Sequence, residues 1–327
     1  MTLVIGTDEA GYGPNLGPLV VAASLWRLDT GDGATASDGA ERRLAALADA
    51  VAGDAGETVW GDSKALYSPG GGVGALERGV LAALGACGGV PADGAALLTR
   101  LGAGLDRAGR AVASAPEWPA LLATRLPVAT AADTITALAA AAAARGAAAR
   151  VALVAVAARV VTPSDFNAAL DEGLNKSDLL SRTTLDLAAS LRAAAPAEEA
   201  LVWCDRHGGR KAYAGLVARH FDTTLPQVLE ETARQSRYRI AAAGGVAPAE
   251  VDFSVGGEAR LPVALASMTA KYLRELSMEA FNAHWCGALP GLRPTAGYPV
   301  DARRWFDEAA PALRAAGLPD GAVWRRA

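Results

Sequence analysis

The stretch T-D-E-A-G-Y-G-P-N-L-G-P occupies residues 7–18. It places two adjacent carboxylates, Asp8 and Glu9, directly after the apolar run Leu3–Ile5 and follows them with three glycines and two prolines. A second apolar run, Leu19–Ala23, comes next. Short apolar runs separated by Gly and Pro are typical of β-strands joined by a turn. We therefore expect a hairpin-like or bulged connection, with both carboxylates at the end of its first strand.

Length and composition narrow the class of protein. The chain has 327 residues, enough for one large domain or two ordinary ones. Its 31 basic and 35 acidic residues give a net charge of −4, which does not indicate a wholly basic nucleic-acid binder but permits a local basic stripe. The three cysteines are far apart, and the N-terminus lacks the basic region of a signal peptide. We expect a cytoplasmic protein without a membrane span.

Strand and helix patterns alternate along the chain, which favours an α/β layer fold. Further strands are expected at 19–25, 151–161 and 200–204, and helices at 40–52, 75–86, 177–194, 211–221, 263–285 and 305–316. Another helix is expected to start at Pro163-Ser164-Asp165, with Ser164 as the N-cap. The Ala- and Gly-rich segment 88–147 is broken by prolines, and we interpret it as an inserted, mainly helical subdomain or lid.

Carboxylates follow several of the expected strands. Asp8, Glu9, Asp62 and Asp205 do so, and Glu258 stands in G-G-E-A-R-L-P before the long helix. Mg²⁺ and Mn²⁺ prefer hard oxygen ligands, and two such ions can hydrolyse a phosphodiester. The alternative is that these residues serve as turn and cap residues, which is common after strands. That alternative explains the adjacent pair least well, because Glu is not a preferred turn residue.

Residues around these carboxylates have the chemistry to contact a nucleic acid. The glycines on either side of Tyr12 leave backbone N–H groups open to a sugar or phosphate. Arg206, Arg210 and Lys211 form a local basic cluster that either contacts phosphates or belongs to a solvated loop. His207, in the same loop, is either active near a leaving group or simply solvated.

Six segments, in order, resemble the type 2 ribonuclease H (ribonuclease HII) family. Residues 8–18, D-E-A-G-Y-G-P-N-L-G-P, resemble the opening signature D-E-A-G-R-G-P-x-x-G-P, and G-D-S-K (61–64) resembles a D-S-K segment. D-E-G-L-N-K-S-D-L-L (171–180) resembles I-D-x-L-N-I-L-x-A-T, and L-V-W-C-D-R-H-G-G (201–209) resembles the strand ending in the third carboxylate. Residues 258–275 resemble D-A-x-Y-P-V-V-S-A-A-S-I-x-A-K-V-x-R-D, and A-G-Y-P-V-D-A-R-R-W (296–305) resembles G-Y-P-x-D-x-x-T.

The resemblance implies a fold and an activity. The fold would be ribonuclease H-like, a mixed central sheet flanked by helices, with a helical C-terminal part. It would comprise an N-terminal part (1–87), the insertion or lid (88–147), the remainder of the domain (148–285) and a C-terminal helical segment (286–327). The reaction would be two-metal hydrolysis, using Mg²⁺ or Mn²⁺, of RNA in RNA–DNA hybrids or of ribonucleotides embedded in duplex DNA. The chain is expected to act as a monomer.

The resemblance also assigns site residues. Asp8, Glu9, Asp205 and Glu258 would be the catalytic metal ligands. The substrate-binding residues would be Gly11, Tyr12, Gly13, Lys64, Arg210, Lys211, Lys271, Arg274 and Tyr298. Among these, the Gly11–Gly13 backbone would recognise the ribose 2′-OH, and Tyr298 would pack on the sugar at the RNA–DNA junction.

This chain departs from the family pattern in three ways. Tyr12 replaces Arg, so a cation is lost and an aromatic ring gained. Glu258 replaces Asp and is one methylene longer. The intervals from Asp62 to Asp205 and from Asp205 to Glu258 are both long. These departures keep two alternatives open: a nuclease of the same fold with an altered nucleic-acid substrate, and a non-catalytic nucleic-acid-binding homologue.

Overall fold

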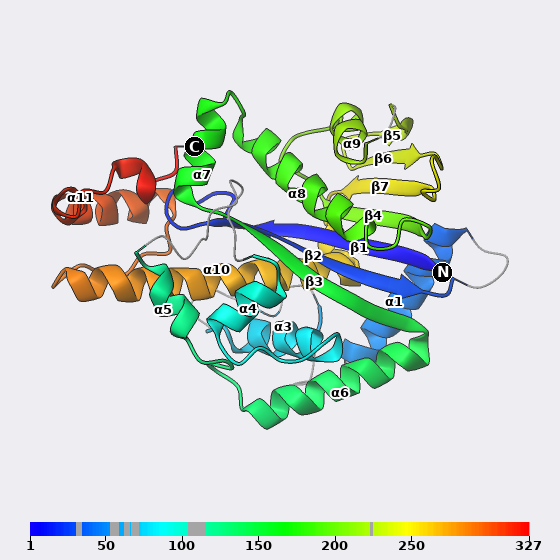
Figure 1. Cartoon of the computed structure of the whole chain (residues 1–327), viewed down its shortest axis with the longest axis horizontal. Helices are drawn as coiled ribbons and strands as arrows, with labels where there is room; N and C mark the ends of the chain where they lie inside the picture. The colour runs from blue at the N-terminus through cyan, green and yellow to red at the C-terminus, as the bar shows by residue number, and fades with distance from the viewer. Residues whose placement is uncertain are drawn as a thin grey trace.

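A computed structural model describes residues 1–30, 35–52, 59–61, 66, 72–103, 116–222 and 225–326. In this part of the chain a seven-stranded sheet has the order β3-β2-β1-β4-β7-β6-β5 (Figure 1). The strands are β1 (Thr2–Ala10), β2 (Leu19–Leu28), β3 (Val151–Val161), β4 (Glu199–Asp205), β5 (Gln227–Glu231), β6 (Gln235–Ile240) and β7 (Ala249–Ser254). The central strands β1, β4 and β7 are parallel, and the other neighbours are antiparallel. The predicted α/β class with a mixed central sheet is confirmed.

Strands β1 and β2 form the expected hairpin, but β1 is longer than predicted. Asp8 pairs with Ala22 and Glu9 with Val21, so both carboxylates lie inside β1 and not beyond its end. The ladder continues through them because the opposing residues of β2 are apolar and fully buried. The turn begins only after Ala10.

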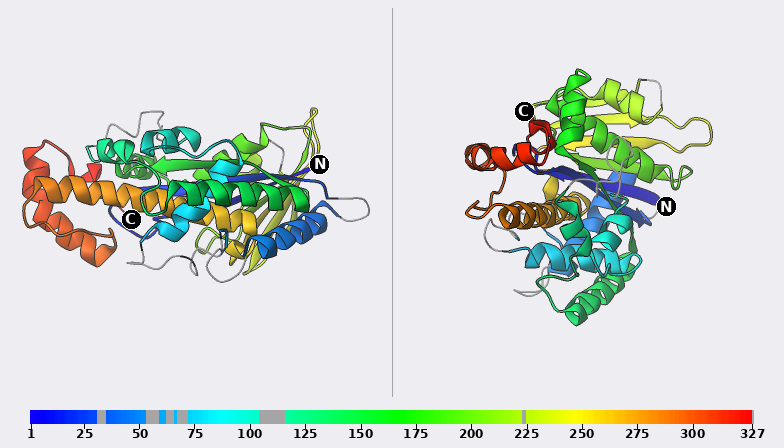
Figure 2. Two further views of the ribbon diagram at one scale, coloured as in Figure 1. Left: turned by 90° about the horizontal axis from the view of Figure 1, so that it is seen from below. Right: turned by 60° about the vertical axis from the view of Figure 1, so that its left-hand side comes forward.

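Helices cover both faces of the sheet (Figures 1 and 2). They are α1 (Ala36–Ala52), α3 (Gly74–Ala86), α4 (Gly94–Arg100), α5 (Trp118–Ala123), α6 (Ala132–Ala149), α7 (Pro163–Asp171), α8 (Lys176–Arg192), α9 (Ala214–His220), α10 (Leu261–Ala288) and α11 (Pro299–Ala315), with short 3₁₀ turns η2 (Gly257–Ala259) and η3 (Asp320–Ala322). Alternation along β1 and β2 divides the core, because successive strand residues face opposite sides. Val4 and Val20 pack with α1, α3 and α10, whereas Ile5 and Val21 pack with α8 and α9.

The N-terminus of α10 crosses β1 at very close range. A Cβ atom on Gly6 would lie 2.2 Å from the carbonyl carbon of Pro262, so only glycine fits there. The Ser24 hydroxyl donates to the Pro262 carbonyl at 2.7 Å, which fixes the same end of α10 to β2. This crossing brings α10 against the strand that carries Asp8 and Glu9.

The described helices of 88–147 are part of the main core. Leu97, Trp118, Leu121 and Ile135 are buried in the cluster that holds α3 and α10. The mainly helical character expected for this segment is therefore observed, while its status as a separate subdomain or lid stays a prediction. Neither this segment nor any other described helix is long and apolar enough to span a membrane.

Glu77, in α3, ties a loop of this segment to α10. Its carboxylate is fully buried and accepts the Val128 and Ala129 N–H groups at 2.6 and 2.9 Å and the Tyr272 hydroxyl at 3.1 Å. We expect Glu77→Gln to lower the free energy of unfolding by about 1–3 kcal/mol, because the amide replaces one acceptor with a donor facing N–H groups. Chemical denaturation would measure it. The matched change Glu198→Gln, which breaks the partly exposed pair with Arg27, should cost less than about 1 kcal/mol, and equal losses would contradict the anchoring role.

Several sequence expectations need correction. The N-cap of α7 is Thr162, whose hydroxyl accepts the Asp165 N–H, and not Ser164. Pro163 then occupies the first turn, where its missing N–H costs nothing. Helix α11 begins at Pro299 and not at Trp305, and there too a proline occupies the first turn of the helix. Strands β5, β6 and β7 were not predicted; they fill the long interval between Asp205 and Glu258.

Candidate active site

Four carboxylates predicted from sequence meet at one end of the sheet. Asp8 and Glu9 lie near the end of β1, and Asp205 ends the parallel neighbour β4. Thr7 is in register with Cys204, so the next residues along, Asp8 and Asp205, lie side by side. Glu258 lies in η2, which follows β7 and leads into α10. The parallel pairing of β1, β4 and β7 gathers all four, since parallel strands end at the same edge.

A backbone contact fixes Glu258 close to Asp205. The Gly257 N–H donates to Asp205 Oδ1 at 2.8 Å. A Cβ on Gly257 would lie 3.1 Å from Asp205 Cα, so a side chain there would push η2 away from β4. The G-G-E sequence thus holds a carboxylate against the end of β4 at a distance that a bulkier residue would not allow.

Burial and mutual repulsion raise the pKa values of the β1 carboxylates. Burial, followed by the charges of Asp205 and Glu258, raises the pKa of Asp8 from 3.8 to about 7, against a lowering contribution from the Ser267 hydroxyl on α10. Burial and then the charges of Asp8, Asp205 and Glu258 hold the pKa of Glu9 well above its ordinary value. Asp8 and Glu9 therefore each lie within the electrostatic influence of Asp205 and Glu258.

The donor set of this cluster fits a divalent cation. Asp8 Oδ1 accepts the Glu9 N–H at 2.8 Å, whereas Oδ2 is buried and has no hydrogen-bond partner among the described residues. Four carboxylates supply hard oxygen donors, and a cation would offset the repulsion that raises the pKa values of Asp8 and Glu9. The described side chains do not yet form a closed ligand set, because no three of their His, Cys, Asp or Glu groups are arranged around one point. Bound ions would have to draw the carboxylates together.

The glycine-rich turn after β1, residues 11–17, is held by two distant segments. The N–H groups of Asn15 and Leu16 donate to the Gly297 carbonyl at 2.8 and 3.3 Å. Gly11 has φ +85°, and a Cβ there would lie 2.6 Å from Arg274 Nε, so both conformation and space require glycine. The exposed Gly13 faces the ring of Tyr298, with 3.9 Å between its ideal Cβ and Cε1. The structure thus places Tyr298 beside Gly13, and the substrate-binding roles of Gly11, Gly13 and Tyr298 stay predictions.

The C-terminal tail is the second segment that holds this turn. Arg325 is fully buried, its guanidinium donates to the Pro14 carbonyl, and its backbone N–H donates to Asn15 O at 2.7 Å. Asn15 Nδ2 returns a hydrogen bond to the Arg325 carbonyl at 3.0 Å. Burial and the charge of Arg274 lower the pKa of Arg325 to about 9. No local pattern in the sequence indicates this contact, which joins residues more than 300 positions apart.

Two of the predicted substrate contacts lie beside Tyr12 or the turn, but in supporting positions. Arg210 lowers the pKa of Tyr12, which burial and Glu9 raise, and its guanidinium pairs with Asp178 at the start of α8. Arg274 is buried and donates to the Ala296 carbonyl at 3.1 Å, so it supports the segment that carries Tyr298. Lys211 is exposed and Lys271 half-buried. Asp62 and Lys64 lie outside the described residues, and the substrate-binding roles of all these residues stay predictions.

His207 and Arg206 are structural in this fold. His207 is almost fully buried, its Nδ1 is 3.0 Å from the Ser181 hydroxyl, and burial lowers its pKa to about 3. A neutral imidazole packed edge-on against Tyr213 and Phe253 explains its presence better than a solvated loop does. Arg206 Nε donates to the Arg210 carbonyl at 2.8 Å and fixes the loop that follows β4.

Two residues near the site were not predicted from the sequence. Ser267 faces Asp8 from α10, and Lys176 at the start of α8 places its Nζ 4.5 Å from the centre of the Tyr12 ring. Both lie inside segments that resemble the family, and Lys176 stands where the quoted pattern has Ile. That substitution was the available signal.

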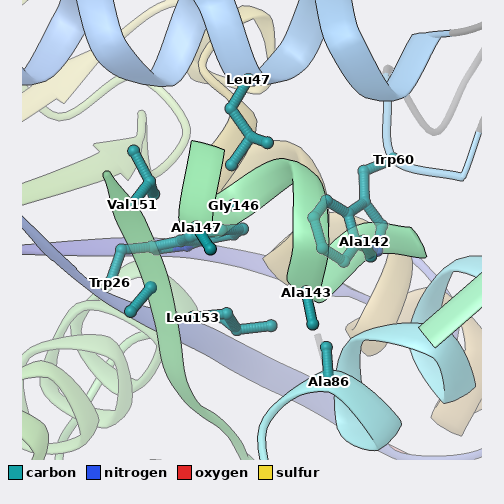
Figure 3. A pocket seen from close by; sticks show the side chains of 11 residues that line it. Trp26, Leu47, Trp60, Ala86, Ala142, Ala143, Gly146, Ala147, Val151 and Leu153 are labelled. Atoms are coloured by element: carbon teal, nitrogen blue, oxygen red, sulfur yellow. The ribbon is translucent and has the colours of Figure 1, made fainter. Parts of the chain in front are cut away.

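A small apolar cavity elsewhere is unrelated to the carboxylates. Trp26, Leu47, Trp60 and Ala142 are among its lining residues, between α1, α6 and β3 (Figure 3). Its volume is about 160 Å³, and no titratable side chain lines it. Both indole N–H groups are already used, on Ser24 Oγ and the Gly79 carbonyl. The cavity is a packing feature of the core.

Comparison with known proteins finds likeness only among solved structures. No protein-family model and no curated protein matches the chain. The PCNA:RNase HII complex from Archaeoglobus fulgidus matches with 16% identity and a TM-score of 0.45, over 98% of this chain and 93% of that one. Ribonuclease H2 from Pyrococcus horikoshii OT3 matches with 16% identity and a TM-score of 0.40, over 98% and 92%. Bst-RNase HIII in complex with Mn²⁺ matches with 17% identity and a TM-score of 0.43, over 99% and 66%. The chain is thus similar along almost its whole length to RNase HII and HIII structures, at low identity.

Proposed function

We propose that this chain is a type 2 ribonuclease H-like endonuclease, which hydrolyses the RNA phosphodiester in RNA–DNA hybrids or at ribonucleotides embedded in duplex DNA. One observation carries the proposal. Carboxylates from β1, β4 and η2 lie at the same end of the sheet, and burial and mutual repulsion raise the pKa values of two of them, Asp8 and Glu9. Holding such a cluster against its own repulsion costs stability, which a structural role does not explain.

The carboxylates Asp8, Glu9, Asp205 and Glu258 would hold Mg²⁺ or Mn²⁺. A pair of such ions activates a water molecule and stabilises the leaving oxygen of a phosphodiester. Gly257 keeps Glu258 against Asp205, and the hydrogen bond from the Glu9 N–H orients Asp8 so that its free oxygen remains available.

The turn after β1 would recognise the sugar. Gly13 and Tyr298 are both exposed and adjacent, so a ribose could lie against the ring while the glycine backbone faces its 2′-OH. The 2′-OH is the group that separates RNA from DNA. Arg325 holds this turn through the Pro14 carbonyl, and Arg274 holds the segment that carries Tyr298 through the Ala296 carbonyl.

The test is cleavage of a labelled DNA duplex that contains one ribonucleotide, in Mg²⁺ and then in Mn²⁺. We expect cutting next to the ribonucleotide by the wild type and none by Asp8→Asn. Binding of the metal alone should raise the Tm of the wild type and leave that of Asp8→Asn unchanged, a readout that does not depend on activity. Absence of both effects would contradict the proposal.

A second candidate is a nuclease of the same fold with a different nucleic-acid substrate. The observation that favours it is Tyr12, which lies where the family pattern has Arg and packs against apolar core residues of both β2 and α8. Cleavage of a continuous RNA–DNA hybrid, with no cleavage at a single embedded ribonucleotide, would support this candidate.

A further inference from the structure

Tyr12 and Lys176 form a contact that the family pattern does not contain. Tyr12 belongs to the turn after β1, and Lys176 is the first residue of α8. The Lys176 ammonium lies 4.5 Å from the centre of the Tyr12 ring, within the range of a cation–π interaction. Ring and lysine are each half-buried, so both still reach the surface beside the exposed Gly13.

The charge on Lys176 is not neutralised within the described structure. No carboxylate of the described residues lies within ion-pair distance of it, whereas Arg210, its neighbour across Tyr12, is paired with Asp178. Burial, followed by the charge of Arg325, lowers the pKa of Lys176. A half-buried lysine whose ammonium lies over a ring and is repelled by a second cation is arranged to receive an anion from outside.

Position makes a phosphate the fitting anion. The Tyr12 hydroxyl lies near the loop that follows β4, 3.8 Å from the position of an ideal Cβ on Gly208. The charge of Glu9 contributes, after burial, to a raised pKa of the same phenol. A strand whose sugar lay on Gly13 would place a neighbouring backbone phosphate beside Tyr12, within reach of the Lys176 ammonium that lies over its ring.

We propose that Lys176, held by the ring of Tyr12, binds a backbone phosphate of the nucleic-acid substrate and supplies the positive charge that the Arg-to-Tyr replacement removes. This inference rests on the proposed function. In this proposal Tyr12 is a positioning residue: its ring holds the Lys176 ammonium, and its hydroxyl is not needed for phosphate binding.

The experiment is the salt dependence of binding to a fluorescent duplex with one ribonucleotide. All proteins carry Asp8→Asn, which prevents cutting, and binding is followed by anisotropy without metal. Removing one phosphate contact lowers the slope of log K against log salt by about 1. We expect Lys176→Ala to show that lower slope and a roughly tenfold weaker Kd. Lys176→Arg and the exposed control Arg314→Ala should change neither the slope nor the Kd.

Tyr12 variants test the coupling. Tyr12→Phe should keep the slope, whereas Tyr12→Leu should lower it, and Tyr12→Leu should have no further effect on the slope once Lys176 is Ala. An unchanged slope for Lys176→Ala in a protein that binds would overturn this inference and leave the proposed function intact. If neither the parent protein nor any variant bound a duplex, both this inference and the proposed function would be overturned.

Discussion

Replacing Asp8 with Asn should abolish cleavage and at the same time stabilise the metal-free protein. We expect a loss of at least about 10³-fold in rate, about 4 kcal/mol of transition-state stabilisation, because the proposed metal-ligand set loses its most buried carboxylate. The substitution also removes a buried charge whose pKa is raised to about 7. An uncharged amide of the same shape avoids that desolvation and the repulsion from Asp205 and Glu258.

The sign of the pH dependence follows from the same pKa. The folded protein holds the Asp8 proton up to about pH 7, whereas the unfolded chain releases it near pH 3.8. Between these values the folded state binds more protons, so the free energy of unfolding falls as pH rises through this window. The penalty is complete above about pH 7 and amounts to at most about 4 kcal/mol. Glu9 acts with the same sign.

Denaturation of both proteins without metal from pH 4 to pH 8 would measure this. The wild type should lose stability across the range, and Asp8→Asn should lose less and be the more stable protein at pH 8. Saturating Mn²⁺ should reverse the order at pH 8, since a cation stabilises the ionised carboxylates of the wild type only. An Asn variant that is less stable at pH 8 without metal would contradict the buried, repelled state of Asp8.

The sequence predicted those parts of the fold that have a strong local pattern. Strand β3 was predicted with its observed bounds, and α10 was expected because apolar residues continue over many turns. Strands β5 to β7 were missed because they are short and rich in polar and charged residues, such as Arg237 and Arg239 in β6, and because cross-strand ion pairs such as Arg239–Glu250 join them. Those pairs depend on partners from other strands, and single-sequence patterns do not contain them.

The candidate site residues that the sequence indicated are those that stand in quoted motifs. The structure places the four carboxylates at one end of the sheet and Tyr298 beside Gly13, and their roles stay predictions. Lys176, Ser267 and Arg325 were not found, because each acts through proximity to a distant segment: Tyr12, Asp8 and Pro14 respectively. His207 was misjudged for the opposite reason, since a loop position does not reveal burial beneath Tyr213 and Phe253.

Gly6→Ala should be among the most destabilising single-methyl additions in this chain. The new Cβ would lie 2.2 to 2.5 Å from backbone and side-chain atoms of Pro262, and rigid backbone on both sides prevents an inexpensive adjustment. We expect a loss of about 3 kcal/mol, or about 6 °C in Tm. Because α10 would move away from β1, Ser267 would also retreat from Asp8, whose pKa would rise further.

Gly287→Ala is the matched control for this prediction. It adds the same methyl group near the other end of α10, with nothing within 4 Å of the new Cβ. Because alanine has a higher helix propensity than glycine, the free energy of unfolding should stay unchanged or rise by up to about 1 kcal/mol. Thermal melts of the two variants beside the wild type measure the difference. Equal stability of Gly6→Ala and Gly287→Ala would mean that α10 does not cross β1 at the observed distance, and the packing of Ser267 against Asp8 would then fail with it.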